Sequence, residues 1–126
     1  MKKVLIIEDD RVLREAVHFK LAHEGYEVIE ASNGELGYQA ILDESPDVVL
    51  LDVEMPKLGG IGVLEKLKKN LIEAKVIVLT NVEESETLAD AMELGVTTYL
   101  IKKDWTLDRV VEEIENITNW ATHLKL

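Results

Sequence analysis

The segment VVLLDVEMP, residues 48–56, decides how the rest of the chain is interpreted. Its four leading apolar residues predict a central strand that is covered on both faces. The run then ends on Asp52, and a second acid, Glu54, follows two positions later. A carboxylate at the end of a buried strand is costly unless it is paired. We therefore expect Asp52 to have a chemical task.

Short apolar runs of this kind recur along the chain and alternate with segments of helical period. The predicted strands are KVLII (3–7), EVIEA (27–31), DVVLL (47–51), KVIVL (75–79) and TTYLI (97–101). This regular alternation predicts a parallel sheet with helices on both faces, which is an open doubly wound α/β fold. The acids within EVIEA indicate that this strand lies at an edge of the sheet.

Between the strands, apolar residues at helical spacing predict five amphipathic helices. Their expected buried faces are Leu13, Ala16, Val17 and Leu21; Leu36, Ala40 and Ile41; Ile61, Leu64, Leu67 and Leu71; Leu88, Ala91 and Met92; and Leu107, Val110, Val111, Ile114 and Ile117. Gly25 and Gly95 stand where the first and fourth helices should end, in the left-handed conformation that glycine favours. SNGE (32–35) has the spacing of a capping box, with Ser32 as the cap of the second helix.

Composition narrows the class of function. The 126 residues suffice for a single domain over 1–126, with a tail at 120–126 that we expect to be frayed. A net charge of −11, from 25 acids against 14 bases, disfavours direct binding to DNA or RNA. No apolar run approaches the roughly 18 residues needed to cross a bilayer, so we expect a cytoplasmic protein without membrane contact. The absence of cysteine excludes disulfides and thiol catalysis.

Polar residues stand directly after four of the predicted strands. They are Glu8, Asp9 and Asp10 after the first, Asp52 after the third, Thr80 and Asn81 after the fourth, and Lys102 and Lys103 after the fifth. Doubly wound folds have their sites at these carboxyl ends. Several carboxylates together suit Mg²⁺, and a bound Mg²⁺ beside a lysine and a hydroxyl can neutralise a phosphoryl group.

Four motifs together carry a family resemblance: VLIIEDD (4–10), DVVLLDVEMP (47–56), VIVLT (76–80) and YLIKK (99–103). Over essentially its whole length the chain resembles the receiver domains of bacterial two-component response regulators. The resemblance implies a flavodoxin-like, CheY-like sheet of five parallel strands in the order 2-1-3-4-5, with five helices. It also implies a signalling switch that catalyses only its own phosphorylation and dephosphorylation.

The same resemblance implies a role for each acid of the site. Asp52 is expected to be the phosphoacceptor, attacking the phosphohistidine of a sensor histidine kinase. Asp9 and Asp52 would ligate Mg²⁺, with Glu8 helping through water and the backbone carbonyl of Glu54 completing the protein ligands. The expected cofactor is therefore Mg²⁺.

The resemblance further implies how the switch works. Lys102 would pair with Asp52 and then with the phosphoryl oxygens, while the Thr80 hydroxyl turns toward the phosphate and Tyr99 moves inward. The surface of the fourth helix, fifth strand and fifth helix would then bind a downstream protein or effector domain, or a second copy in a homodimer. Lys103 replaces the usual proline and Asn81 a small residue, departures that concern switching geometry and phosphoryl lifetime.

Two other functions fit parts of the pattern. A phosphatase or phosphotransferase of the haloacid-dehalogenase type also uses a strand-ending nucleophile with an acid two residues on, as Asp52 and Glu54 provide. A flavodoxin-like FMN carrier shares the strand alternation, but it needs a Ser/Thr/Gly-rich loop where this chain has EDDR (8–11). His18, His23 and His123 lack ligand spacing and are expected to be surface or packing residues.

Overall fold

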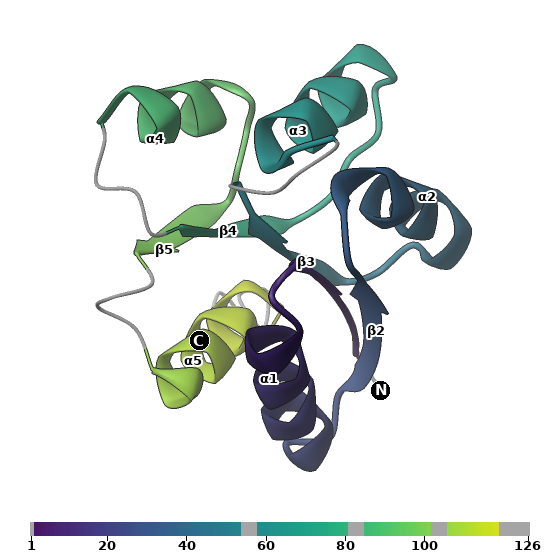
Figure 1. Ribbon diagram of the computed structural model, residues 1–126, viewed down its shortest axis with the longest axis vertical. Coiled ribbons are helices and arrows are strands. Elements are labelled where there is room, and N and C mark those ends of the chain that lie inside the picture. Colours follow the sequence, from purple (N-terminus) through teal and green to yellow (C-terminus); the bar gives the residue numbers. More distant parts are fainter. Residues whose placement is uncertain (1, 54–57, 81–84, 102–105, 119–126) are drawn as a thin grey trace, which may run out of the picture.

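The computed structural model describes residues 2–53, 58–80, 85–101 and 106–118, in which strands and helices alternate along the chain (Figure 1). The strands are β1 (Lys3–Ile7), β2 (Glu27–Ala31), β3 (Val48–Asp52), β4 (Val76–Thr80) and β5 (Thr98–Ile101). The helices are α1 (Arg11–His23), α2 (Gly34–Glu44), α3 (Gly60–Lys69), α4 (Ser85–Glu93) and α5 (Leu107–Thr118). All the predicted strands are confirmed, each to within one residue at either end.

The strands form one parallel sheet in the order β2-β1-β3-β4-β5. The predicted doubly wound α/β fold is confirmed, and so is the edge position of β2. Within the described ranges, no helix is both long and apolar enough to span a membrane.

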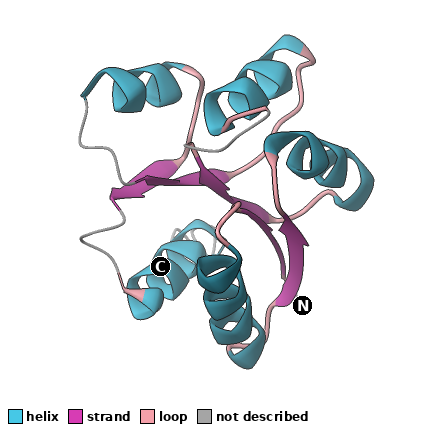
Figure 2. Cartoon of the chain, viewed as in Figure 1, coloured by secondary structure: helices cyan, strands magenta, loops and turns pink. Residues whose placement is uncertain are grey.

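Helices cover both faces of the sheet, with α1 and α5 on one side and α2, α3 and α4 on the other (Figures 1 and 2). Successive residues of a strand point to opposite faces. Val48 and Leu50 therefore join the core beneath α1 and α5, while Val49 and Leu51 join the core beneath the other three helices. This double coverage explains why β3 is an unbroken apolar run.

Two of the predicted helix ends are confirmed and one predicted cap is wrong. Gly25 and Gly95 have φ angles of 96° and 91°, the left-handed conformation expected of them. At the start of α2, however, Asn33 is the cap, because its side-chain oxygen accepts the Leu36 N–H at 2.9 Å. The helix begins one residue later than a Ser32 cap requires.

Most residues of the predicted helix faces that the structure describes are buried or partly buried, but four are exposed. Leu36 and Met92 are 55% and 52% exposed, Leu71 is 91% exposed, and Ala16 is exposed too. Leu71 lies beyond the last residue of α3, in a turn with φ of 55°, so it cannot continue the helical stripe. The predictions for the side chain of Leu88 and for the tail at 120–126 fall outside the described residues.

Packing at α2 explains the exposure of Leu36. The helix buries Gly34, Gly37 and Ile41, which lie three and four residues apart on a single face. A Cβ atom on Gly37 would lie 2.5 Å from the Ile7 side chain, so the helix approaches β1 closely at this point. The buried stripe is therefore centred on the glycines, and Leu36 points away from it.

Candidate functional site

The carboxyl ends of β1 and β3 bring the predicted acids together. Ile7 and Leu51 are partners in the parallel pairing, so the residues after them, Glu8 and Asp52, emerge side by side. Glu8 is 2% exposed and Asp52 3% exposed, whereas Asp9 is exposed. Carboxylate oxygens of Glu8, Asp9 and Asp52 all lie within 4.8 Å of one another.

Three carboxylates at this separation form a donor set that suits a hard divalent cation. The burial of two of these acids and the mutual repulsion of all three cost folding free energy, and a bound cation offsets both costs. Carboxylate oxygens are the ligands that Mg²⁺ prefers, so these three residues have the right chemistry to hold that ion.

The third acid of the first strand end has a structural role. Asp10 caps α1, since its Oδ1 accepts the N–H groups of Val12 and Leu13 at 3.0 and 3.2 Å. Its own backbone N–H donates to Glu8 Oε2 at 3.2 Å. Because this acid is committed to the helix start, the EDD motif supplies two acids to the site and one to the helix.

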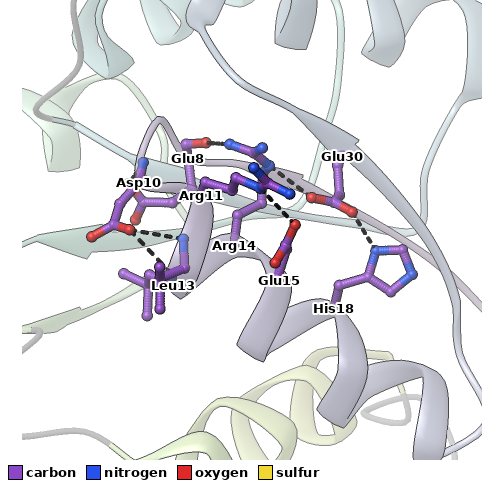
Figure 3. A network of polar contacts seen from close by, with 9 residues as sticks. Glu8, Asp10, Arg11, Leu13, Arg14, Glu15, His18 and Glu30 are labelled. Carbon is purple, nitrogen blue, oxygen red and sulfur yellow. Dashed lines mark hydrogen bonds and ion pairs between the residues drawn. The ribbon is translucent and has the colours of Figure 1, made fainter.

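Sequence reasoning missed a polar network beside the cluster, which Figure 3 shows. Arg14 donates from Nη1 to the backbone carbonyl of Glu8 at 2.9 Å and from Nε to Glu30 Oε1 at 2.7 Å. The other Glu30 oxygen, Oε2, lies 2.7 Å from His18 Nδ1. His18 is therefore a surface residue with a defined partner.

The carboxyl of Glu30 is tuned by this network. Partial burial of Glu30 would raise its pKa, but the hydrogen bonds with Arg14 and then His18 outweigh burial and hold the pKa below its ordinary value. Glu30 is therefore a stable anion and a firm anchor for the guanidinium. The one feature of the sequence that could have indicated this network is the position of Arg14, one helical turn after the Asp10 cap.

The start of α3 presses against the backbone of Asp52. A Cβ atom on Gly60 would lie 2.6 Å from the Asp52 carbonyl oxygen, closer than real Cβ contacts come. Only glycine fits without displacing one of the two elements, so the α3 start helps to fix the end of β3. The sequence offers no periodic signal for this contact.

The remaining predicted site residues are placed only in part. Asp52 is paired with Leu79, so Thr80, the last residue of β4, reaches the same edge of the sheet as Asp52. Tyr99 lies in β5 opposite Val78 and is 40% exposed. The Thr80 side chain lies outside the described residues, as do Glu54, Asn81, Lys102 and Lys103.

A comparison of the sequence with known protein families agrees with this fold and this arrangement of acids. The sequence model of the response regulator receiver domain matches residues 4–115. The chain belongs to this family. The resemblance carried by the four sequence motifs is therefore confirmed. The match favours a receiver domain of two-component signalling over the two alternative functions.

Individual relatives support the same assignment. Over 119 residues the receiver domain is 36% identical to the transcriptional regulatory protein CrdR of Helicobacter pylori, covering 94% of this chain and 55% of CrdR. The N-terminal domain of an uncharacterized Wolinella succinogenes protein is 34% identical, with a TM-score of 0.86 and coverage of 99% of this chain and 97% of the other. The receiver domain spans about half the length of the curated relatives it matches.

One solved relative was crystallised with a metal. The response regulator TrrA of Thermotoga maritima, in complex with Mg²⁺-BeF, is 31% identical, with a TM-score of 0.80 and coverage of 93% of this chain and 99% of the other. Receiver domains are signalling switches, and the family generally uses Mg²⁺ at an acidic pocket. The described part of this chain contains an acidic group formed by Glu8, Asp9 and Asp52.

Proposed function

We propose that this receiver domain is a phosphoacceptor switch in which Asp52 takes a phosphoryl group from the phosphohistidine of a sensor histidine kinase. The observation that carries the proposal is the buried Asp52 at the end of β3, with oxygens of Glu8 and Asp9 within 4.8 Å. An Asp52 oxygen attacks phosphorus as the bond from phosphorus to the histidine nitrogen breaks. The product is an aspartyl phosphate, and the histidine is released.

The acids around Asp52 would hold a Mg²⁺ ion. Asp9 and Asp52 would be direct ligands, Glu8 would bind through water, and the backbone carbonyl of Glu54 would supply a further oxygen. When bound, Mg²⁺ neutralises charge that develops on the transferring phosphoryl oxygens. The complex of TrrA with Mg²⁺-BeF, in a relative 31% identical, supports a metal at this site.

The switch itself would use residues of β4 and β5. Lys102 would pair with Asp52 and later with the phosphoryl oxygens, and the Thr80 hydroxyl would close on the phosphate. The position of Thr80 at the end of β4, beside the Asp52 edge, supports its part in this movement. The inward movement of Tyr99 would follow, starting from the partly exposed position that this side chain has in β5.

The phosphorylated domain would pass on its signal by binding another protein. A net charge of −11 disfavours DNA binding by this chain, so its partner would be a downstream protein or effector domain. The contact surface would be that of α4, β5 and α5, through which a phosphorylated homodimer would also form. The receiver domain would catalyse only its own phosphorylation and dephosphorylation.

The test is incubation with acetyl phosphate, followed by intact mass measurement. The parent should gain a single phosphoryl group with Mg²⁺ and none with EDTA. Labelling in EDTA at the same rate would contradict the metal assignment. Sustained turnover of a phosphate ester would instead favour the haloacid-dehalogenase alternative.

A further inference from the structure

The loop that carries Glu8 and Asp9 is held from two directions. The Glu8 N–H donates to the Ala31 carbonyl of β2 at 3.1 Å. On the other side, the Glu8 carbonyl accepts a hydrogen bond from Arg14 Nη1 at 2.9 Å. That carbonyl belongs to the peptide that joins Glu8 to Asp9. Because the peptide is planar, holding this carbonyl also holds the Asp9 Cα atom, from which the side chain extends.

Packing restrains the side chain of Asp9 less than those of the other two acids. Glu8 and Asp52 are almost completely buried, so packing restricts their rotamers. Asp9 is exposed. A group that sets the Glu8–Asp9 peptide therefore has most influence on the carboxylate of Asp9.

Arg14 reaches the Glu8 carbonyl because of where two elements place it. Its backbone N–H donates to the Asp10 carbonyl at 2.9 Å, one turn into α1, and helical side chains lean toward the helix start. Glu30 is paired in register with Ile6, whose side chain lies in the core beneath α1, so its carboxylate is on the α1 side of the sheet. Figure 3 shows the guanidinium between Glu8 and Glu30.

We propose that Arg14, anchored by Glu30, is a positioning residue that sets the Glu8–Asp9 peptide and thereby orients Asp9 for Mg²⁺. This inference rests on the proposed function of the acid cluster and goes beyond it by adding a group that touches neither metal nor phosphate. Two nitrogens of one planar guanidinium serve two acceptors at once, which an ammonium group cannot reproduce in the same geometry. The bridging side chain is only 16% exposed, so water competes weakly for these bonds.

The direction in which Mg²⁺ affinity changes distinguishes a positioning role of Arg14 from an effect of its positive charge. Arg14 is a cation beside three acids, so removing its charge alone would make the site more negative and Mg²⁺ binding tighter. Removing a positioning contact would make binding weaker. Arg14→Met, which keeps the apolar stem, therefore gives opposite results under the two explanations.

The experiment is calorimetric titration of the metal-free chain with Mg²⁺ at fixed ionic strength. Arg14→Met should bind Mg²⁺ roughly tenfold more weakly than the parent, the low end of the range for groups that orient metal ligands. Arg14→Lys keeps the charge and should still bind several-fold more weakly. The matched control is Arg11→Met, which removes an equal charge from the same helix but only breaks an exposed ion pair with Glu15. This control should bind Mg²⁺ as tightly as the parent or slightly more so.

A second readout separates positioning from general damage to the fold. If the defect is in metal binding, saturating Mg²⁺ should restore the rate at which Arg14→Met reacts with acetyl phosphate. If Arg14→Met does not fold, Arg14→Lys decides alone, because a charge effect predicts no change for it. Equal or tighter Mg²⁺ binding by the Arg14 variants would overturn the inference and leave the proposed function standing. A parent without saturable Mg²⁺ binding would overturn both.

Discussion

Crowding of like charges should make the acid cluster destabilising in the absence of metal. Asp52→Asn removes one charge and keeps the shape of the side chain. Two unit charges 4.8 Å apart, the outer limit within this cluster, repel by about 3.5 kcal/mol at an effective dielectric constant of about 20. Asp52 faces two such neighbours, Glu8 and Asp9, although the cation expected from Lys102 and local hydrogen bonds offset much of that repulsion.

The net gain in stability should be smaller than the repulsion energy of one such pair of charges. We expect Asp52→Asn to raise the free energy of unfolding of the metal-free protein by roughly 1–2 kcal/mol. For a domain of this size that corresponds to a melting temperature about 3–8 °C higher. Mg²⁺ at ten times its Kd should stabilise the parent by about 1.4 kcal/mol and the variant far less.

The assay is thermal unfolding of both proteins in EDTA and in Mg²⁺. Asp10→Asn is the matched control, because it removes a charge from the same loop while asparagine still caps α1. Its free energy of unfolding should stay within about 0.5 kcal/mol of the parent. The reasoning is refuted if the parent melts at one temperature in both buffers and Asp52→Asn gains no stability.

Three further predictions concern the switch, the packing around Asp52 and the polar network. Thr80→Ala should still accept phosphate but lose the phosphorylation-dependent NMR shift changes over 83–94 and 97–101. If the variant shows the same shift changes on phosphorylation as the parent does, the coupling does not depend on Thr80. Gly60→Ala should lower stability by about 1–3 kcal/mol and slow phosphorylation, because its Cβ would crowd the Asp52 carbonyl; a melting curve and labelling rate like the parent's would count against that contact. The folded-state pKa of Glu30 lies below its ordinary 4.5, so its stabilising contribution is complete above that pH and is lost as the pH falls through the lower folded value. Glu30→Gln should therefore show a shallower loss of melting temperature below pH 4.5 than the parent, and parallel curves would exclude the effect.

The strands and the acid cluster were predictable for a common physical reason. Buried parallel strands need apolar residues on both faces, so runs such as VLII and VVLL mark them. The carboxyl ends of neighbouring parallel strands lie at one edge, so Glu8 and Asp52 could be brought together without coordinates. The pairing of Ile7 with Leu51 then accounts for the short distance between these two acids.

The polar network could not be predicted because it depends on the register between distant elements. Arg14 and Glu30 meet only because β2 pairs with β1 so that Ile6 is opposite Glu30 and α1 packs on that face. The exposure of Leu36 likewise follows from the close approach of Gly37 to Ile7, which periodicity does not report. Hydropathy gives the spacing of a face but not its rotation about the helix axis.

The central claim is that Asp52 is the residue that accepts the phosphoryl group. The most direct measurement is intact mass of the parent, Asp52→Asn and Asp10→Asn after parallel incubation with acetyl phosphate and Mg²⁺. The account predicts a single phosphoryl group on the parent and on Asp10→Asn, and none on Asp52→Asn. Labelling of Asp52→Asn to the same extent as the parent would contradict it.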